Sequence, residues 1–171
     1  MGLSVAERAH RIATFRFVEV RLMEIAAAWT PTTAELEVKV LLGRHIWDFA
    51  QHADALGKRA FELRLPLQHS LRPAEPYCQL LEELAGIEGT AERLAGLYAG
   101  LLPGLERRYS LYAAGADPIL DAPSLVILER IQQDLARQRR EAELLRGELA
   151  LPVADAETWA GREAALELLA A

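Results

Sequence analysis

Apolar positions recur along most of the chain with the three-to-four-residue period of an α-helix. The segments with this period are rich in Ala, Leu, Glu and Arg, which favour helix, and glycine and proline interrupt them only sparsely. The pattern therefore predicts four long helices. They cover approximately residues 4–29, 32–63, 90–113 and 121–149.

The predicted helix boundaries follow from capping residues and prolines. Pro31 ends the first helix, and residues 32–35 (TTAE) have the spacing of a capping box for the second. Residues 64–76 contain three prolines and are expected to form a loop across one end of the molecule. A short helix over residues 77–85 follows, and Pro103 is expected to end or kink the third long helix.

These elements define the expected fold class, which is all-α. Four long helices, with short connections and one longer crossover after the second, predict an up-and-down four-helix bundle. We expect a single domain over residues 1–171, with the bundle over about residues 4–149. Residues 150–171 are expected to add a short amphipathic C-terminal helix that is capped by Asp155.

Three polar residues lie on the apolar side of the second predicted helix. His45, Asp48 and His52 are spaced i,i+3 and i,i+4, so they share an arc about 60° wide by the helical period. Glu19 lies in the same way at the centre of an apolar face of the first predicted helix. Because an ionised carboxylate among apolar side chains is costly, Glu19 must be paired, protonated or bound to a metal.

With these inward residues, the sequence resembles the ferritin-like bundles that carry dinuclear non-haem iron. Residues 43–54 (GRHIWDFAQHAD) and residues 117–124 (DPILDAPS) are also similar to uncharacterised bacterial ferritin-like proteins. The resemblance extends over about residues 10–148. It implies the ferritin-like topology, with one long crossover and polar side chains directed at the bundle centre.

The resemblance also implies that the dinuclear site is incomplete. Iron-containing members of the family use one Glu from each of two helices and a Glu-x-x-His pair from each of the other two. In this chain Gln51 follows Asp48 by three residues, where the pattern has histidine. Leu135 and Gln138 occupy the corresponding positions of the fourth helix. Two carboxylates and two histidines therefore remain where the family uses six ligands.

The first of three open interpretations is a hydrogen-bonded network without metal. In it the histidines hold Asp48, and Arg139 or Arg16 offsets the charge of Glu19. A protein of this kind needs no cofactor and is expected to act by binding or assembly and not by iron storage.

The second interpretation is a non-haem oxidoreductase with a single iron or manganese ion. Its candidate ligands are Glu19, His45, Asp48 and His52. Only one of the two histidines can reach a given ion, because they lie two helical turns apart, about 10 Å along the axis. The third interpretation is a bundle that binds a small organic ligand. Its candidate pocket residues are Tyr98, Tyr109, Gln132, Gln138 and Arg139.

Composition and charge restrict the partners and the location. The 171 residues carry 19 basic and 25 acidic side chains, a net charge of −6, so no basic surface for nucleic acid is expected. Charged residues interrupt every apolar stretch that is long enough to enter a membrane as a span. The single cysteine cannot form an internal disulfide, and the expected location is the cytoplasm.

Two surface features complete the sequence-based expectations. Trp47 lies on the outer, polar side of the second helix, where it needs a cover from the C-terminal helix or from a second subunit. A homodimer through Trp47 or through the C-terminal helix is therefore an expected form of assembly. The charges over residues 137–143 alternate in sign and predict a solvated, salt-bridged helix face.

Overall fold

The computed structural model describes residues 3–170, and the regular structure in this range is helical throughout. The predicted all-α class is therefore confirmed. In chain order the elements are α1 (Val5–Trp29), the 3₁₀ turn η1 (Thr30–Thr32), α2 (Leu36–Glu62), α3 (Glu75–Ala85), α4 (Thr90–Leu94), the π-helical segment η2 (Ala95–Leu101), α5 (Leu102–Gly115), α6 (Ala122–Glu148) and α7 (Glu157–Ala165). α4, η2 and α5 follow one another without a break and form one long helical segment.

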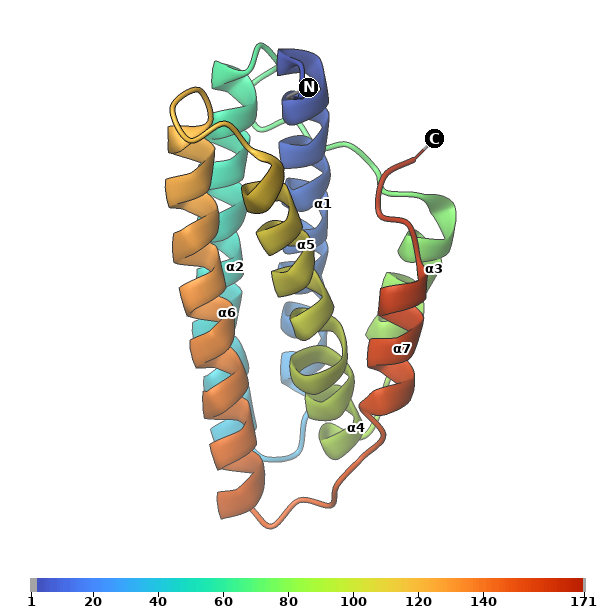
Figure 1. Ribbon diagram of the computed structural model, residues 1–171. Helices are drawn as coiled ribbons and strands as arrows, with labels where there is room; N and C mark the ends of the chain where they lie inside the picture. Colours follow the sequence, from blue (N-terminus) through green and yellow to red (C-terminus); the bar gives the residue numbers. More distant parts are fainter. Residues whose placement is uncertain (1–2, 171) are drawn as a thin grey trace.

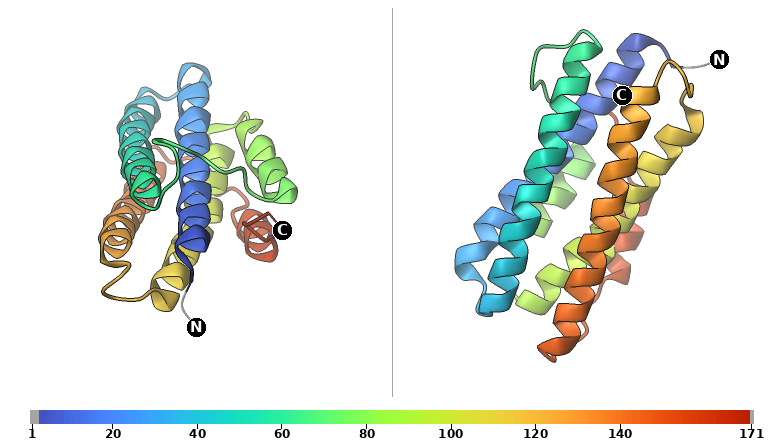
Figure 2. Two further views of the ribbon diagram at one scale, coloured as in Figure 1. Left: turned by 90° about the horizontal axis from the view of Figure 1, so that it is seen from above. Right: turned by 90° about the vertical axis from the view of Figure 1, so that its left-hand side faces the viewer.

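Four long helical segments lie side by side along a common axis, as Figures 1 and 2 show. α1 packs on α2, α2 packs on α6, and α6 packs on α5. The connection over residues 63–74 is the predicted longer crossover, and it passes over α1, where the Leu71 amide donates to the Ala13 carbonyl at 3.1 Å. α3 and α7 lie next to each other outside the four long segments, with α7 against η2 (Figure 1).

One connected cluster of buried apolar side chains fills the space between the long segments. Phe15 of α1 makes edge-on contacts with Tyr109 and Tyr112 of α5, with ring centroids 4.7 and 5.9 Å apart. At the other end of α1 the indole nitrogen of Trp29 donates to the Ala85 carbonyl at 3.0 Å. Aromatic side chains thus fix α1 against α5 at one end and against α3 at the other.

The start of α2 differs from the predicted capping box. The chain after α1 forms η1, and the hydroxyls of Thr32 and Thr33 both donate back to the Trp29 carbonyl. The Glu35 carboxylate accepts from the Thr90 hydroxyl at 2.6 Å, and α2 begins one residue later. The capping-box prediction is therefore wrong, because the threonines satisfy the end of α1 and the glutamate reaches α4 instead.

The third long helix does not end at Pro103, although an end there was one of the two effects expected of this proline. Instead the backbone widens to π-helical spacing over η2, directly before the proline. Pro103 has no N–H to donate to the preceding turn, and a π-type turn is a common way to absorb such a defect. On this segment Gly100 lies so close to Trp159 of α7 that a Cβ atom there would collide with the Trp159 side chain.

A buried carboxylate anchors α7 to the bundle. Glu163 is fully buried and accepts from Tyr77 at 3.2 Å, from Arg107 at 3.2 Å and from Arg108 at 2.5 Å. Gly104 of α5 makes room for it, since a Cβ atom at this position would overlap the Glu163 carboxylate. α7 is therefore fixed against α3 and α5, while Trp47 on α2 remains 65% exposed. Of the two covers expected for Trp47, the C-terminal helix is therefore excluded.

We expect the substitution Gly104→Ala to lower the free energy of unfolding by about 1–3 kcal/mol, because the added methyl group displaces Glu163. Gly147→Ala is the matched control, since nothing lies within 4 Å of a Cβ atom there, and it should raise the stability by about 0.4–1 kcal/mol. Urea unfolding followed by far-UV circular dichroism measures both values. Equal stability of the two variants would contradict the proposed packing of α7.

Candidate functional site

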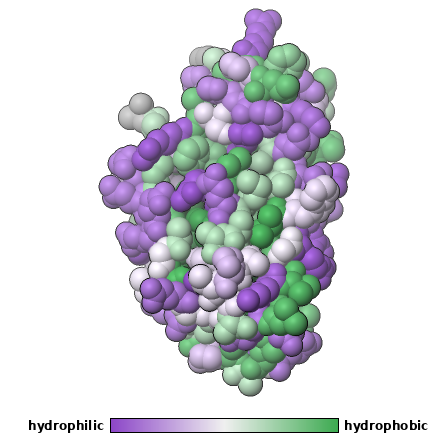
Figure 3. Space-filling model, turned by 180° about the vertical axis from the view of Figure 1, so that it is seen from behind, coloured by the Kyte–Doolittle hydropathy of each residue, from purple (hydrophilic) through white to green (hydrophobic). Residues whose placement is uncertain are grey.

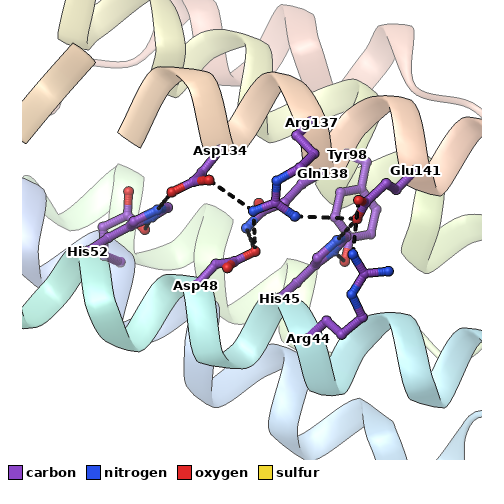
Figure 4. Close-up of polar contacts among 10 residues, drawn as sticks. Arg44, His45, Asp48, His52, Tyr98, Asp134, Arg137, Gln138 and Glu141 are labelled. Atoms are coloured by element: carbon purple, nitrogen blue, oxygen red, sulfur yellow. Dashed lines mark hydrogen bonds and ion pairs between the residues drawn. The ribbon is translucent and has the colours of Figure 1, made fainter. Parts of the chain in front are cut away.

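The inward polar residues of α2 face α6 in the centre of the molecule. His45 and His52 are buried, and Asp48 lies between them with 17% of its side chain exposed. The predicted burial of Glu19 on α1 is also confirmed. Figure 4 shows that Asp134, Arg137, Gln138 and Glu141 point from α6 toward these α2 side chains. These four α6 residues are partners that the sequence analysis did not assign to the α2 side chains.

His52 joins three helices. Its Nδ1 lies 3.0 Å from Glu19 of α1, and its Nε2 lies 3.2 Å from Asp134 of α6. The hydroxyl of Tyr109 on α5 donates to the second Glu19 oxygen at 2.5 Å. Carboxylates only accept hydrogen bonds, so both ring nitrogens of His52 donate when the ring is a protonated imidazolium. The geometry therefore favours a positive charge on His52.

Asp48 is held by α6 and not by the histidines. Its Oδ2 accepts from Arg137 at 2.9 Å and from the amide nitrogen of Gln138 at 3.0 Å. The same Arg137 nitrogen lies 2.9 Å from Asp134, so one guanidinium links two carboxylates on different helices. The prediction that histidines hold Asp48 is wrong. Arg137, on the helix face that was predicted to be solvated and salt-bridged, is 32% exposed and also reaches across to Asp48.

His45 joins α2 to η2 and to α6. Its Nδ1 lies 2.7 Å from the Tyr98 hydroxyl, and its Nε2 lies 2.9 Å from Glu141, which also accepts from Arg44 at 3.1 Å. Tyr98 is a hydrogen-bond donor here because burial raises the pKa of its hydroxyl above the ordinary value. A neutral His45 satisfies both partners, with Nε2–H donating to Glu141 and Nδ1 accepting from Tyr98.

Together these contacts form a chain of polar side chains, the interhelical polar network. It runs from Tyr109 through Glu19, His52 and Asp134 to Arg137, which contacts both Asp48 and Glu141, and from Glu141 through His45 to Tyr98. The four carboxylates in it face three positive groups, which are His52, Arg137 and the neighbouring Arg44. Protein side chains thus supply most of the positive charge that bound metal ions supply in a carboxylate-rich bundle.

The two histidines respond to burial in opposite ways. Burial opposes protonation of His52, but the charges and hydrogen bonds of Glu19 and Asp134 outweigh burial and raise the pKa of His52 above 6.5. Burial lowers the pKa of His45 below 6.5, and Glu141 offsets this only in part. The difference follows from the number of carboxylates at each ring, which is two for His52 and one for His45.

The side chains present do not fit a dinuclear centre of the kind that iron-containing ferritin-like bundles carry. Among residues 3–170 no group of three or more His, Cys, Asp or Glu side chains is placed to hold a metal ion. The four candidate ligands do not converge on one point, because Glu19 contacts His52, whereas Asp48 contacts Arg137 and His45 contacts Glu141. Both ring nitrogens of His52 contact carboxylates within the chain. A metal ion at Glu19 would have to displace the His52 and Tyr109 contacts.

The expected partners of Glu19 are replaced by others. Arg16 donates to Gln68 and to Ser70 of the crossover, and Arg139 donates to Glu106 at 2.8 Å. Neither arginine contacts Glu19, so that prediction is wrong. The sequence does carry one signal for the missed residues, because Asp134, Arg137, Gln138 and Glu141 have i,i+3 and i,i+4 spacing on α6.

The candidate ligand residues lie in different places. Gln138 and Tyr109 belong to the polar network or contact it, while Gln132 donates to Ser110 and to the Glu106 carbonyl. Tyr98 and Arg139 line a groove of about 300 Å³ between α4 and η2, α6, and the connection to α7. The groove therefore contains two of the five candidate pocket residues, and Tyr109, Gln132 and Gln138 are not part of its lining.

Comparisons with known proteins give no further assignment. No protein-family model matches the chain, and neither a curated protein nor a solved structure matches it significantly. Within residues 3–170 no helix has both the length and the apolar character that a membrane span requires.

We expect the His52 ring to titrate above pH 6.5 and the His45 ring below it, as measured by NMR of the histidine side chains. The raised pKa of His52 stabilises the fold fully below pH 6.5, and this contribution is lost as the pH rises through the pKa of the folded state. The lowered pKa of His45 gives the reverse dependence, with a contribution above pH 6.5 that is lost on acidification.

The variants His45→Gln and His52→Gln assign the signals and test the stability effect. Relative to the unsubstituted protein, His52→Gln should lose most stability below pH 6.5, and the difference should narrow as the pH rises. If both rings titrated at the same pH, the different carboxylate contacts of His45 and His52 would not control their pKa values, and the prediction would be wrong.

Proposed function

We propose that the protein is a ferritin-like four-helix bundle in which the interhelical polar network replaces the dinuclear metal centre. In this proposal the chain acts by binding or assembly and not by iron storage. Four long helical segments with a long crossover after the second support the ferritin-like arrangement. Polar side chains from α1, α2, η2, α5 and α6 meet in the interior of the bundle, and ferritin-like bundles build their metal sites from inward side chains of facing helices.

The observation that carries the proposal is the commitment of the imidazole nitrogens. Each ring nitrogen of His45 and His52 lies within hydrogen-bond distance of a side chain from another helix. A metal ligand needs a free nitrogen lone pair, and binding would leave a buried carboxylate or hydroxyl without its partner. Gln138 strengthens this argument, because it donates its amide to Asp48 where the family pattern has a ligating histidine.

Metal analysis tests the proposal directly. After anaerobic incubation with ferrous iron or manganese and removal of the excess, we expect clearly substoichiometric metal by plasma mass spectrometry. The same result is expected for His52→Ala, since no metal depends on this residue. One or two iron or manganese ions per chain that disappear in His52→Ala would overturn the proposal in favour of an oxidoreductase.

A specific observation favours a second candidate, the binding of a small organic ligand in the groove at Tyr98 and Arg139. The lining is mainly apolar, and the side chains of Arg139, Glu143 and Arg146 on α6 contribute its charges. A volume of about 300 Å³ accommodates about ten non-hydrogen atoms at about 30 Å³ each. An aliphatic carboxylate of the size of octanoate matches this volume and the apolar lining, and its carboxylate can accept from the N–H groups of Arg139 that do not contact Glu106.

Isothermal titration calorimetry with octanoate tests this second candidate. Ala99→Trp fills the groove from an exposed position, and Arg139→Gln removes a charge, so each should weaken binding about tenfold or more. Arg72→Gln changes an exposed arginine outside the groove and should leave binding unchanged. Equal affinity in all variants, or no heat of binding in the unsubstituted protein, would remove the groove as a ligand site.

A further inference from the structure

The outer face of α2 carries an apolar stripe that the fold does not use. Leu36, Val40 and Trp47 are 69%, 58% and 65% exposed, and Gly43 lies between the last two on the same face. We call these four residues the α2 outer stripe. Figure 3, which views the molecule from behind, shows apolar surface at the lower end, where α2 begins. Exposed apolar surface of this kind usually marks an interaction site.

The spacing of the stripe is that of a helix-packing seam. Its positions follow one another by four, three and four residues, which is the heptad-type spacing that lets two helices pack along a common line. Gly43 has no side chain, and a Cβ atom built there would meet nothing within 4 Å, so the seam has a gap between Val40 and Trp47 that we call the hollow. The stripe thus offers large side chains next to a hollow that accepts one.

We propose that the α2 outer stripe is the contact surface of a two-fold homodimer, in which α2 packs antiparallel on α2 of a second copy. This arrangement places Leu36 opposite Trp47 of the second copy and Val40 opposite the hollow at Gly43. The two-fold axis repeats both contacts, so all four stripe positions of each chain are occupied. The stripe is therefore complementary in shape to itself.

The charges beside the stripe fit the same arrangement. Glu37 and Arg44 are exposed, lie seven residues apart and share one flank of the stripe. In an antiparallel pair Glu37 of one chain approaches Arg44 of the other, and the symmetry makes this contact twice. Arg44 already donates to Glu141, and a guanidinium has five N–H donors, so it can serve both carboxylates. In a parallel pair this flank would lie on opposite sides of the seam in the two copies, so Glu37 and Arg44 would not meet.

The contact area sets the expected strength of the dimer. A tryptophan contributes about 150–250 Å² when fully buried, and one pair of helices stays below the about 1,200 Å² of a standard stable interface. The dimer is therefore reversible and depends on the protein concentration, with dissociation in the micromolar range. The inference rests on the proposed role in assembly, for which it names the partner as a second copy of this chain.

Analytical ultracentrifugation of the full chain over a concentration series from about 1 to about 100 µM tests this inference. The unsubstituted protein should shift from monomer to dimer. Trp47→Glu should raise the dissociation constant about thirtyfold or more, because it removes the largest side chain and adds a charge. Gly43→Leu fills the hollow and should also weaken the dimer. Leu111→Glu is the control, since Leu111 is 66% exposed on α5, and it should not change the dissociation constant.

Charge reversal tests the antiparallel arrangement. Glu37→Arg and Arg44→Glu should each weaken the dimer, and the double variant should restore it, whereas a merely structural role of either residue would give no restoration. A monomer at all concentrations, or a dimer that survives Trp47→Glu, would overturn the inference. Either result would overturn only the dimer, because the metal analysis does not depend on association. Stoichiometric iron would overturn the proposed function, whether the protein is a monomer or a dimer.

Discussion

The pair formed by Glu19 and His52 is the constraint on which the rest of the structure depends. Glu19 has no exposed surface, and a buried carboxylate is tolerated only with partners that offset its loss of hydration. His52 at 3.0 Å and Tyr109 at 2.5 Å supply those partners from two other helices. Removing one side of such a buried pair typically costs about 3–5 kcal/mol. A single carboxylate therefore holds α1, α2 and α5 together. Asp134 of α6 joins the same group through its contact with His52.

The pair of Glu19 and His52 also explains why charged and polar groups lie between α2 and α6. Apolar packing alone would suffice for stability there. Once His52 carries a positive charge, a second carboxylate is favourable on its free side, and Asp134 then needs Arg137. Arg137 in turn reaches Asp48, and each step advances about one turn along the two antiparallel helices. A shift of α6 by one turn would leave buried charges without partners. The network thus specifies one register, whereas apolar side chains tolerate several.

The sequence predicted the helices and the inward residues because both depend only on the period of a single helix. Glu19, His45 and His52 lie among apolar neighbours on their own helical faces, and burial followed directly. Their partners could not be predicted, since the register between α2 and α6 is a property of two helices. Arg137 and Glu141 illustrate this limit, because alternating charges are equally typical of a solvated face. Glu35 shows it at a helix end, where the tertiary contact with Thr90 prevails over local capping.

The inner network also determines what α2 presents to solvent. Successive residues of an α-helix are about 100° apart, so a turn of α2 by one residue would withdraw His45 and His52 from all of their partners. The network therefore fixes the rotation of α2 about its axis, and with it the outward position of Trp47. A surface that is held rigidly before it meets a partner loses little conformational entropy on contact. The polar residues inside the bundle thereby preorganise the apolar stripe outside it, so the inner and outer faces of α2 are coupled.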